Sequence, residues 1–557
     1  MHNRKPRERF LARAGAVVAA LSLTVGALAA CAPVDSGESA DGVWLNVGNG
    51  SDNLTQVFNP FLPDPSALNM IGGTKGSFIY EPLVQINMVD IGNNTPWLAK
   101  SWEWTNDNKT FTITLQDDVK WSDGEAFSAD DVVFTYDLVA KDPALNRSGI
   151  TFDSVKAVDD STVEFDFATP SRESFFSLVS LPIVSEHIWS KVEDPATYED
   201  KEPVGTGAFV LDTFSPQSLT LKANTDYWGK KPQIAGLRFI PYKDNTAQLA
   251  ALVQGDIDWA GTYIPNVEQS YLSKNDHFHY WSPATGIDGL IPNLEVWPLS
   301  ELPVRQAISL AVDRTQLAAS RDSQPASNVI GLPMPAFESV VAPEFKDKDF
   351  YQDADEAASI LENDGWAKGS DGIWAKDGKK LEFSVSFPSA YTDIAAFAQA
   401  LVSQLGDFGI TMTINGVQPS DINGLTAMGD FDSTLGYPTD SFPDAFSYYN
   451  VIMNPAYYVP IGTNNETLRN IQRFNDPKAK ELFAAYPLAT SDEERTDILN
   501  QLQSIWVNQL PIITMFYWGY YANWSDEKVT GFPDEGNAYA NPFPNAVTAI
   551  NLVPVTK

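Results

Sequence analysis

The stretch VKWSDGEAFSADDVVF, residues 119–134, holds a turn followed directly by the start of a helix. Asp123-Gly124 is typical of a tight turn, and Trp121 is typical of a large side chain buried beneath one. Ser128, followed by two acidic residues, predicts an N-cap with favourable charge in the first helical turn. The helix would carry an apolar side made of Val132, Val133, Tyr136 and Val139.

The segments on both sides of this stretch show strand and helix patterns. Alternation of apolar and polar residues, typical of strands, occurs at 111–115 and 163–167. Apolar residues at helical spacing occur at 304–312, 394–405 and 498–506. Because strands and helices are mixed without strict βαβ alternation, the sequence predicts a mixed α/β or α+β fold built in layers.

The N-terminal segment has the pattern of a bacterial lipoprotein signal. A basic stretch comes first, and an uncharged, largely apolar run follows from Ala14 to Ala30. Cys31, the only cysteine of the chain, comes directly after Leu-Ala-Ala, which resembles a lipobox. We therefore expect a signal peptide over 1–30, followed over 31–42 by a lipidated Cys31 and a flexible, polar tether. A plain secretory signal or a one-pass anchor is the alternative, although the apolar run is short for a spanning helix.

The composition limits the classes of partner. The chain has 72 acidic and 37 basic side chains, and its net charge is −35. A chain of this charge repels nucleic acid and anionic lipid, so neither is an expected partner. Its 557 residues are too many for one hydrophobic core, so two or three domains are expected. A single cysteine excludes an internal disulfide.

Motifs for catalysis or for cofactor binding are missing from the sequence. His277 and His279 could share a strand face and bind a metal, but no third ligand is evident, and a solvated turn accounts for them as well. The sequence has no Gly-x-Ser-x-Gly nucleophile turn and no phosphate-binding loop. The acidic residues between 117 and 131 lack the spacing of a calcium loop. The sequence therefore predicts no catalytic residue, no metal, no cofactor and no enzymatic activity.

Several segments resemble one family in the same order along the chain. They are residues 96–104 (PWLAKSWEW), 109–111, 119–125, 127–134, 203–207 (PVGTG), 227–228 (YW), 252–258 (LVQGDID), 304–308 (VRQAI) and 313–314. This order looks like the family-5 solute-binding proteins of ABC importers, which include oligopeptide-, dipeptide-, nickel- and some oligosaccharide-binding proteins. The resemblance covers nearly all of the chain after residue 42.

The resemblance implies a fold with distinct domains. Family members have a periplasmic-binding-protein-like fold of cluster C, in which two lobes close over a ligand through a hinge and one lobe carries an extra domain. Carried onto this sequence, the resemblance implies the following ranges: lobe one over 43–81, 204–291 and 525–557, the extra domain over 82–203, and lobe two over 292–524. The 119–134 stretch would then be structural within the extra domain.

The resemblance also implies a transport function. The protein would be exported and held by its lipid to the cell membrane, facing the periplasm or the cell surface. As a monomer it would capture a peptide or an oligosaccharide and deliver it to permease subunits that are driven by ATPase subunits. A lipid-anchored secreted hydrolase and a sensor that docks to a receptor are the alternatives from other functional classes.

The resemblance points to two classes of ligand. In peptide-binding members, an aspartate on lobe two pairs with the free amine of the peptide. The matching position is Asp440, with Tyr437 in place of the family's tryptophan and a one-residue gap in the match. Asp440 is equally typical of a turn residue. Nickel is disfavoured because the chain is poor in histidine.

The C-terminal segments favour an oligosaccharide instead. Residues 459–462, 473–475, 529–533 and 537–540 resemble the branch whose members bind β-linked glucosides such as cello-oligosaccharides. Sugar faces stack on aromatic rings, and Tyr517, Trp518 and Tyr521 offer such rings on a predicted strand. Strand alternation would place Tyr517 and Tyr521 on one side and Trp518 on the other. One of these two faces is expected to be core.

Overall fold

The structure is a computed structural model that describes residues 42–50, 54–147, 149–321, 323–389, 391–436 and 442–556. The predicted signal peptide over 1–30, Cys31 and almost all of the predicted tether lie outside the described residues, as do Tyr437 and Asp440. Within the described ranges, no helix combines the length and the apolar character needed to cross a membrane.

A seven-stranded sheet forms the core of the first lobe, and its strands come from three separate parts of the chain. Its order is β12 (Phe278–Trp281), β22 (Ala522–Ser525), β11 (Trp259–Ala260), β1 (Trp44–Gly50), β10 (Gly236–Tyr242), β9 (Ser218–Ala223) and β8 (Phe209–Ser215). The helices α1 (Ser66–Met70), α2 (Gly73–Gly76), α6 (Asn245–Gln254), α7 (Val267–Ser270) and α16 (Ala546–Ala549) belong to this part of the molecule. β1 pairs in parallel with both β10 and β11.

A six-stranded sheet forms the core of the second lobe. Its order is β14 (Gln324–Pro325), β21 (Ile513–Gly519), β13 (Ala284–Pro292), β20 (Ser433–Gly436), β18 (Glu382–Pro388) and β19 (Thr411–Val417). Helices accompany it: α8 (Leu302–Ala311), α9 (Arg314–Ala319), α10 (Ala354–Asn363), α11 (Thr392–Phe408), α12 (Pro419–Met428), α13 (Ala445–Met453), α14 (Pro477–Ala485) and α15 (Asp492–Gln509). The predicted helices at 304–312, 394–405 and 498–506 are confirmed as α8, α11 and α15.

Smaller elements complete the fold. The strands β15 (Ala367–Lys368), β16 (Trp374–Lys376) and β17 (Lys379–Lys380) form a three-stranded sheet beside the second lobe. The pairs β2 (Val84–Gln85) with β3 (Thr95–Pro96), and β23 (Val529–Thr530) with β24 (Val553–Pro554), form two-stranded sheets.

The motif stretch 119–134 lies in a third layer, built on the antiparallel sheet β4 (Ala99–Thr105), β5 (Thr110–Leu115), β7 (Thr162–Asp166) and β6 (Ser154–Asp159). The helices α3 (Ala129–Lys141), α4 (Phe175–Val179) and α5 (Glu186–Trp189) lie with it. Ser128 caps α3, as the sequence predicts, and it also forms a reciprocal capping box with Asp131. Trp121 is buried, and its indole donates a hydrogen bond to Asp131 at 3.2 Å.

Other motif segments meet where this layer joins the first lobe. The carboxylate of buried Glu81 accepts hydrogen bonds from Trp97 Nε1 at 2.6 Å, Tyr227 Oη at 2.7 Å and Trp228 Nε1 at 3.0 Å. Gly205 lies so close to this junction that an added Cβ would be 2.0 Å from the carbonyl oxygen of Ile79. The Pro-Trp, Gly-Thr-Gly and Tyr-Trp motifs are therefore parts of one buried junction.

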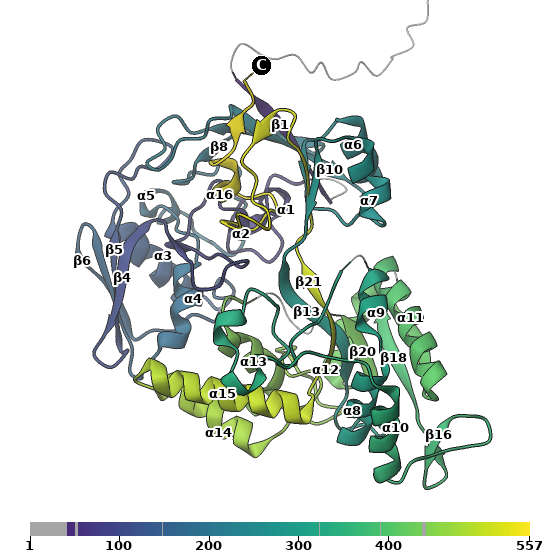
Figure 1. Cartoon of the computed structure of the whole chain (residues 1–557). Coiled ribbons are helices and arrows are strands. Elements are labelled where there is room, and N and C mark those ends of the chain that lie inside the picture. The colour runs from purple at the N-terminus through teal and green to yellow at the C-terminus, as the bar shows by residue number, and fades with distance from the viewer. Residues whose placement is uncertain are drawn as a thin grey trace, which may run out of the picture. The chain divides into compact units, whose positions relative to one another are not determined.

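Two strands, β13 and β21, run side by side out of the second sheet towards the first (Figure 1). The predicted boundary after residue 291 falls inside β13, which belongs to the second sheet, and the boundary after residue 524 falls inside β22, which belongs to the first. We therefore propose that the chain crosses between the lobes at residues 282–283 and 520–521. The range predicted for the extra domain stays a prediction.

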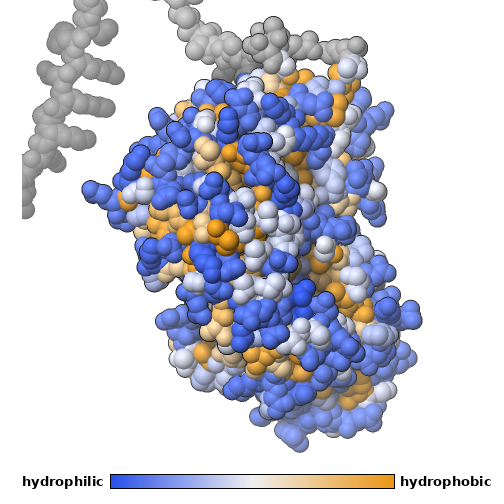
Figure 2. Space-filling model, turned by 90° about the vertical axis from the view of Figure 1, so that its left-hand side faces the viewer, coloured by the Kyte–Doolittle hydropathy of each residue, from blue (hydrophilic) through white to orange (hydrophobic). Residues whose placement is uncertain are grey.

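The surface agrees with the charge of the chain. Figure 2 shows hydrophilic side chains over most of the face that it presents, with hydrophobic residues in separate patches among them. A surface of this kind, on a chain with a net charge of −35, favours solubility over association.

Candidate ligand-binding site

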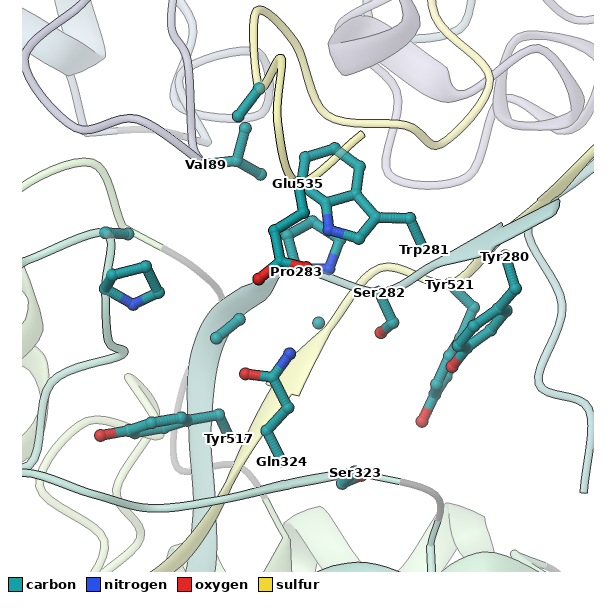
Figure 3. A pocket seen from close by; sticks show the side chains of 15 residues that line it. Val89, Tyr280, Trp281, Ser282, Pro283, Ser323, Gln324, Tyr517, Tyr521 and Glu535 are labelled. Atoms are coloured by element: carbon teal, nitrogen blue, oxygen red, sulfur yellow. The ribbon is translucent and has the colours of Figure 1, made fainter. Parts of the chain in front are cut away.

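A cavity of about 330 Å³ is lined by residues 280–284 and by Tyr517, Gly519 and Tyr521, in the segments where we propose that the chain crosses between the lobes. This volume is at the lower end of the range for small-molecule sites, roughly 300–1,000 Å³. Its wall is made of Val89, Tyr280, Trp281, Ser282, Pro283, Ala284, Ser323, Gln324, Pro335, Ala336, Tyr517, Gly519, Tyr521, Glu535 and Ala538. Figure 3 shows that these residues reach the cavity from several segments of the chain.

The cavity lies at the edge of the second sheet where its parallel strands end. β18 runs parallel to β19 and to β20, so their carboxyl ends point the same way. β13 is antiparallel to β20, with Pro292 opposite Ser433 and Gly289 opposite Gly436, so β13 begins at the edge where β20 ends. Ligands of open sheets bind beyond the carboxyl ends of parallel strands, and the cavity lies at this edge.

Tyr517 forms part of the wall and is also held by the fold. Its side chain is only 4% exposed, and its hydroxyl accepts a hydrogen bond from the Ser327 backbone N–H at 3.1 Å. Burial raises the pKa of Tyr517, so the phenol stays protonated. β14 pairs with β21 at this point, with Gln324 opposite Tyr517. These contacts hold the ring of Tyr517 in place as one wall of the cavity.

Polar side chains face the cavity from opposite sides. Figure 3 shows the amide of Gln324 and the carboxylate of Glu535 pointing toward one another across it. Ser282 lies in the crossing segment between them. Among the residues that line the cavity, Glu535 is the one that carries a charge, and no Lys, Arg or His is among them.

A buried ion-pair network lies under the segment that carries Gln324. Arg321 pairs with the fully buried Asp288 of β13 and, through Nη2 at 2.6 Å, with Asp393 in the first turn of α11. Burial is the largest single influence and lowers the pKa of Arg321, but the attraction to Asp288 and Asp393 and the hydrogen bond to Asp288 act against it, and the net shift of the pKa is upward. The charged guanidinium thus ties this segment to β13 of the second sheet.

The residues predicted from the sequence fall into different places. Tyr517 and Tyr521 line the cavity, together with Gly519 between them. Trp518 lies outside the lining; its ring contacts Tyr520, with centroids 5.2 Å apart, and it packs beside Gly286. Tyr437 and Asp440 are outside the described residues.

Sequence reasoning missed several side chains of the wall, among them Trp281, Gln324 and Glu535. Gln324 and Glu535 are single residues without a motif around them, whereas Trp281 ends the aromatic run 278–281 of β12, a pattern that could have pointed to it. The prediction drew only on the aromatic run near Tyr521.

His277, just before β12, and His279, within it, both contact the carboxylate of Asp526. His277 Nδ1 lies 2.6 Å from one oxygen of Asp526, and His279 Nε2 lies 2.9 Å from the other. In the part of the chain that the structure describes, no group of three or more His, Cys, Asp or Glu side chains is arranged to hold a metal ion.

A family model matches this chain over residues 93–459, and it is the model of the bacterial extracellular solute-binding proteins, family 5. The chain belongs to this family. It is therefore a substrate-binding protein of an ABC importer, an exported transport protein and not an enzyme. Such a protein has a solute as its ligand and permease and ATPase subunits as its partners.

Known proteins agree with this assignment. Protein XP55 of Streptomyces lividans is 28% identical over 84% of this chain and 85% of its own. The oligopeptide-binding protein OppA of Bacillus subtilis is 24% identical over 92% of this chain and 96% of its own. The solved periplasmic oligopeptide-binding protein of Thermotoga maritima shares the fold, with a TM-score of 0.81 at 22% identity over 92% of this chain and 99% of its own. The same protein has also been solved with mannohexaose bound.

Proposed function

We propose that this protein is a lipid-anchored binding protein that captures a short oligosaccharide, of the cello-oligosaccharide type, for import. The observation that carries the proposal is the lining of the cavity: aromatic rings, neutral hydrogen-bonding groups and one carboxylate, without a cation. Sugar rings stack on aromatic faces, and their hydroxyls donate to carboxylates and amides. The small volume favours a short ligand.

The cavity suits a sugar better than a whole peptide. A free peptide has a carboxylate at one end, and a binding site satisfies such a group with Arg, Lys or backbone N–H donors. The described lining has no Arg and no Lys to serve that end. Tyr517 and Tyr521 supply ring surface at the wall, and Trp518 supports β21 from its other face.

An oligopeptide is the second candidate, because OppA of Bacillus subtilis carries that name at 24% identity. A peptide would need a partner for its amine, and Asp440 with its neighbour Tyr437 is the position that the family resemblance assigns to it. Closure of the two lobes over either ligand would be a hinge motion favoured by contacts to both lobes.

Titration calorimetry separates the two candidates. The panel contains cellobiose to cellopentaose, mannohexaose and a pool of di- to pentapeptides, and we expect heat from the cello-oligosaccharides. Asp440→Asn then reports the chemistry: loss of a buried amine partner costs about 2 kcal/mol or more, whereas loss of one hydrogen bond to a sugar costs about 1 kcal/mol. Heat from peptides without heat from sugars would refute the oligosaccharide assignment.

The anchor is tested separately. Cys31→Ser removes the proposed lipidation site. The variant should therefore be released from the membrane fraction, either with its signal peptide uncleaved or without a lipid. A variant that is still processed normally and stays with the membranes would refute the lipid anchor. Size-exclusion chromatography with light scattering tests the proposed monomer.

A further inference from the structure

The C-terminal segment places one acidic side chain at the cavity by means of a rigid turn. Asp534 and Asn537 bridge across a tight turn, in which the Asn537 N–H donates to the Asp534 carbonyl at 3.0 Å. The Asp534 side chain also accepts from the Gly536 N–H at 2.8 Å. Asp at the first position of a turn favours this geometry. Glu535 therefore lies at the tip of a fixed turn.

The turn is fastened to its surroundings on both sides. Tyr539 donates from its hydroxyl to the Gly531 carbonyl at 2.6 Å, and Asn87 Nδ2 donates to the Ala538 carbonyl at 3.0 Å. Phe532 packs on Trp259, with ring centroids 5.3 Å apart. None of these contacts involves the Glu535 side chain, so the fold holds the turn without using that carboxylate.

The Glu535 carboxylate points into the cavity, on the side where Trp281 lies (Figure 3). Gln324 faces it from the opposite wall, and no other lining residue carries a charge. No ion pair of Glu535 occurs among the described residues. An acceptor that the fold does not use, held beside an aromatic wall, is placed to meet hydrogen-bond donors of a ligand.

We propose that Glu535 sets the charge specificity of the site: it accepts hydrogen bonds from the hydroxyl or ammonium groups of a ligand and rejects ligands that bring a carboxylate to this end. This inference rests on the proposed function for whether the hydrogen-bond donors of the ligand are sugar hydroxyls or a peptide ammonium group. The rejection of ligands with a carboxylate at this end applies to both ligand classes. Two like charges a few ångströms apart repel, and a tenfold difference in affinity corresponds to about 1.4 kcal/mol.

Calorimetry with two matched pairs of probes tests the rule. The sugar pair is cellotriose and its C1-oxidised acid, and the peptide pair is trialanine amide and N-acetyl-trialanine. In each pair that binds, the wild-type protein should prefer the uncharged or cationic probe by about tenfold or more. Glu535→Gln should reduce this preference to about threefold or less, and Glu535→Lys should reverse it. Glu193→Gln, an exposed carboxylate on another part of the surface, is the matched control and should change nothing.

The outcomes separate the two proposals. A silent sugar pair together with a peptide pair that obeys the charge rule would refute the oligosaccharide assignment and keep the role of Glu535. Equal preference in the wild type and in Glu535→Gln would overturn that role, and so would tight binding of the anionic probes to the wild type. Heat from none of the four probes would overturn it too. Unchanged melting temperatures of the variants show that the turn is intact.

Discussion

The buried carboxylate of Glu81 should make the stability of this protein fall as the pH rises. Glu81 is completely buried at the junction between the first lobe and the layer that contains α3, and burial raises its pKa from 4.5 to about 7, although hydrogen bonds from Trp228 and Tyr227 oppose the shift. The folded protein thus holds a proton that the unfolded chain releases above pH 4.5. The stabilisation from this group is complete below pH 4.5 and is lost as the pH rises through 7.

The magnitude follows from the two pKa values. Between pH 5 and pH 8 the contribution of Glu81 to the free energy of unfolding should fall by roughly 2–3 kcal/mol. Glu81→Gln removes the titration, because an amide is neutral at every pH. Its NH₂ group would face indole and phenol donors, however, which costs about 1–3 kcal/mol for an unsatisfied buried group at all pH values. The variant should therefore be less stable than the wild type at pH 5 and close to it at pH 8.

The assay is urea unfolding at half-unit steps from pH 5 to pH 8, followed by tryptophan fluorescence, since Trp97 and Trp228 contact Glu81 directly. The quantity of interest is the difference between wild type and Glu81→Gln, because the other acidic groups titrate equally in both proteins and cancel. Glu193→Gln is the control, and its difference from wild type should be independent of pH. A difference for Glu81→Gln that stays constant over this range would refute the reasoning.

Two further substitutions test the framework of the second lobe and of the layer that contains α3. Arg321→Met leaves Asp288 buried without its partner and should lower the free energy of unfolding by about 3–5 kcal/mol. Urea unfolding measures this change, and a loss below about 1 kcal/mol would show that the ion pair is dispensable. Ser128→Ala removes the N-cap of α3 and should cost about 1 kcal/mol, whereas Ser128→Asp should restore most of it in the same thermal melts. Equal stability of the alanine and aspartate variants would contradict a capping role.

The sequence predicted those parts of the fold that depend on neighbouring residues. The N-cap at Ser128 and the helix after it need only local contacts, so both can be predicted from the 119–134 stretch. Strand β5 shows its alternation because one face is buried, with Phe111, Ile113 and Leu115 all inside. The crossings that we propose between the lobes are harder to derive from the sequence, because every residue of β13 is buried and its pattern does not mark where the strand begins.

Residues of the cavity wall were predictable only where several aromatic residues follow one another. Tyr517 and Tyr521 stand in such a run, and both line the cavity. Gln324 and Glu535 stand alone in their segments, more than 200 residues apart, and only the topology brings them to face each other. No periodicity in the sequence encodes a contact of this kind.

The residues that hold the cavity and the residues that face it are different residues, and this separation explains how one family can serve different ligands. Arg321 fastens one wall through a buried ion pair, and Asn87 fastens the C-terminal turn through a carbonyl. Neither contact uses Gln324 or Glu535, so those two side chains can change without cost to the fold. The motif stretch 119–134 lies outside the cavity lining altogether, so it identifies the family and gives no information about the ligand. We therefore expect ligand specificity to depend on the side chains of the cavity wall, which is the site that we propose.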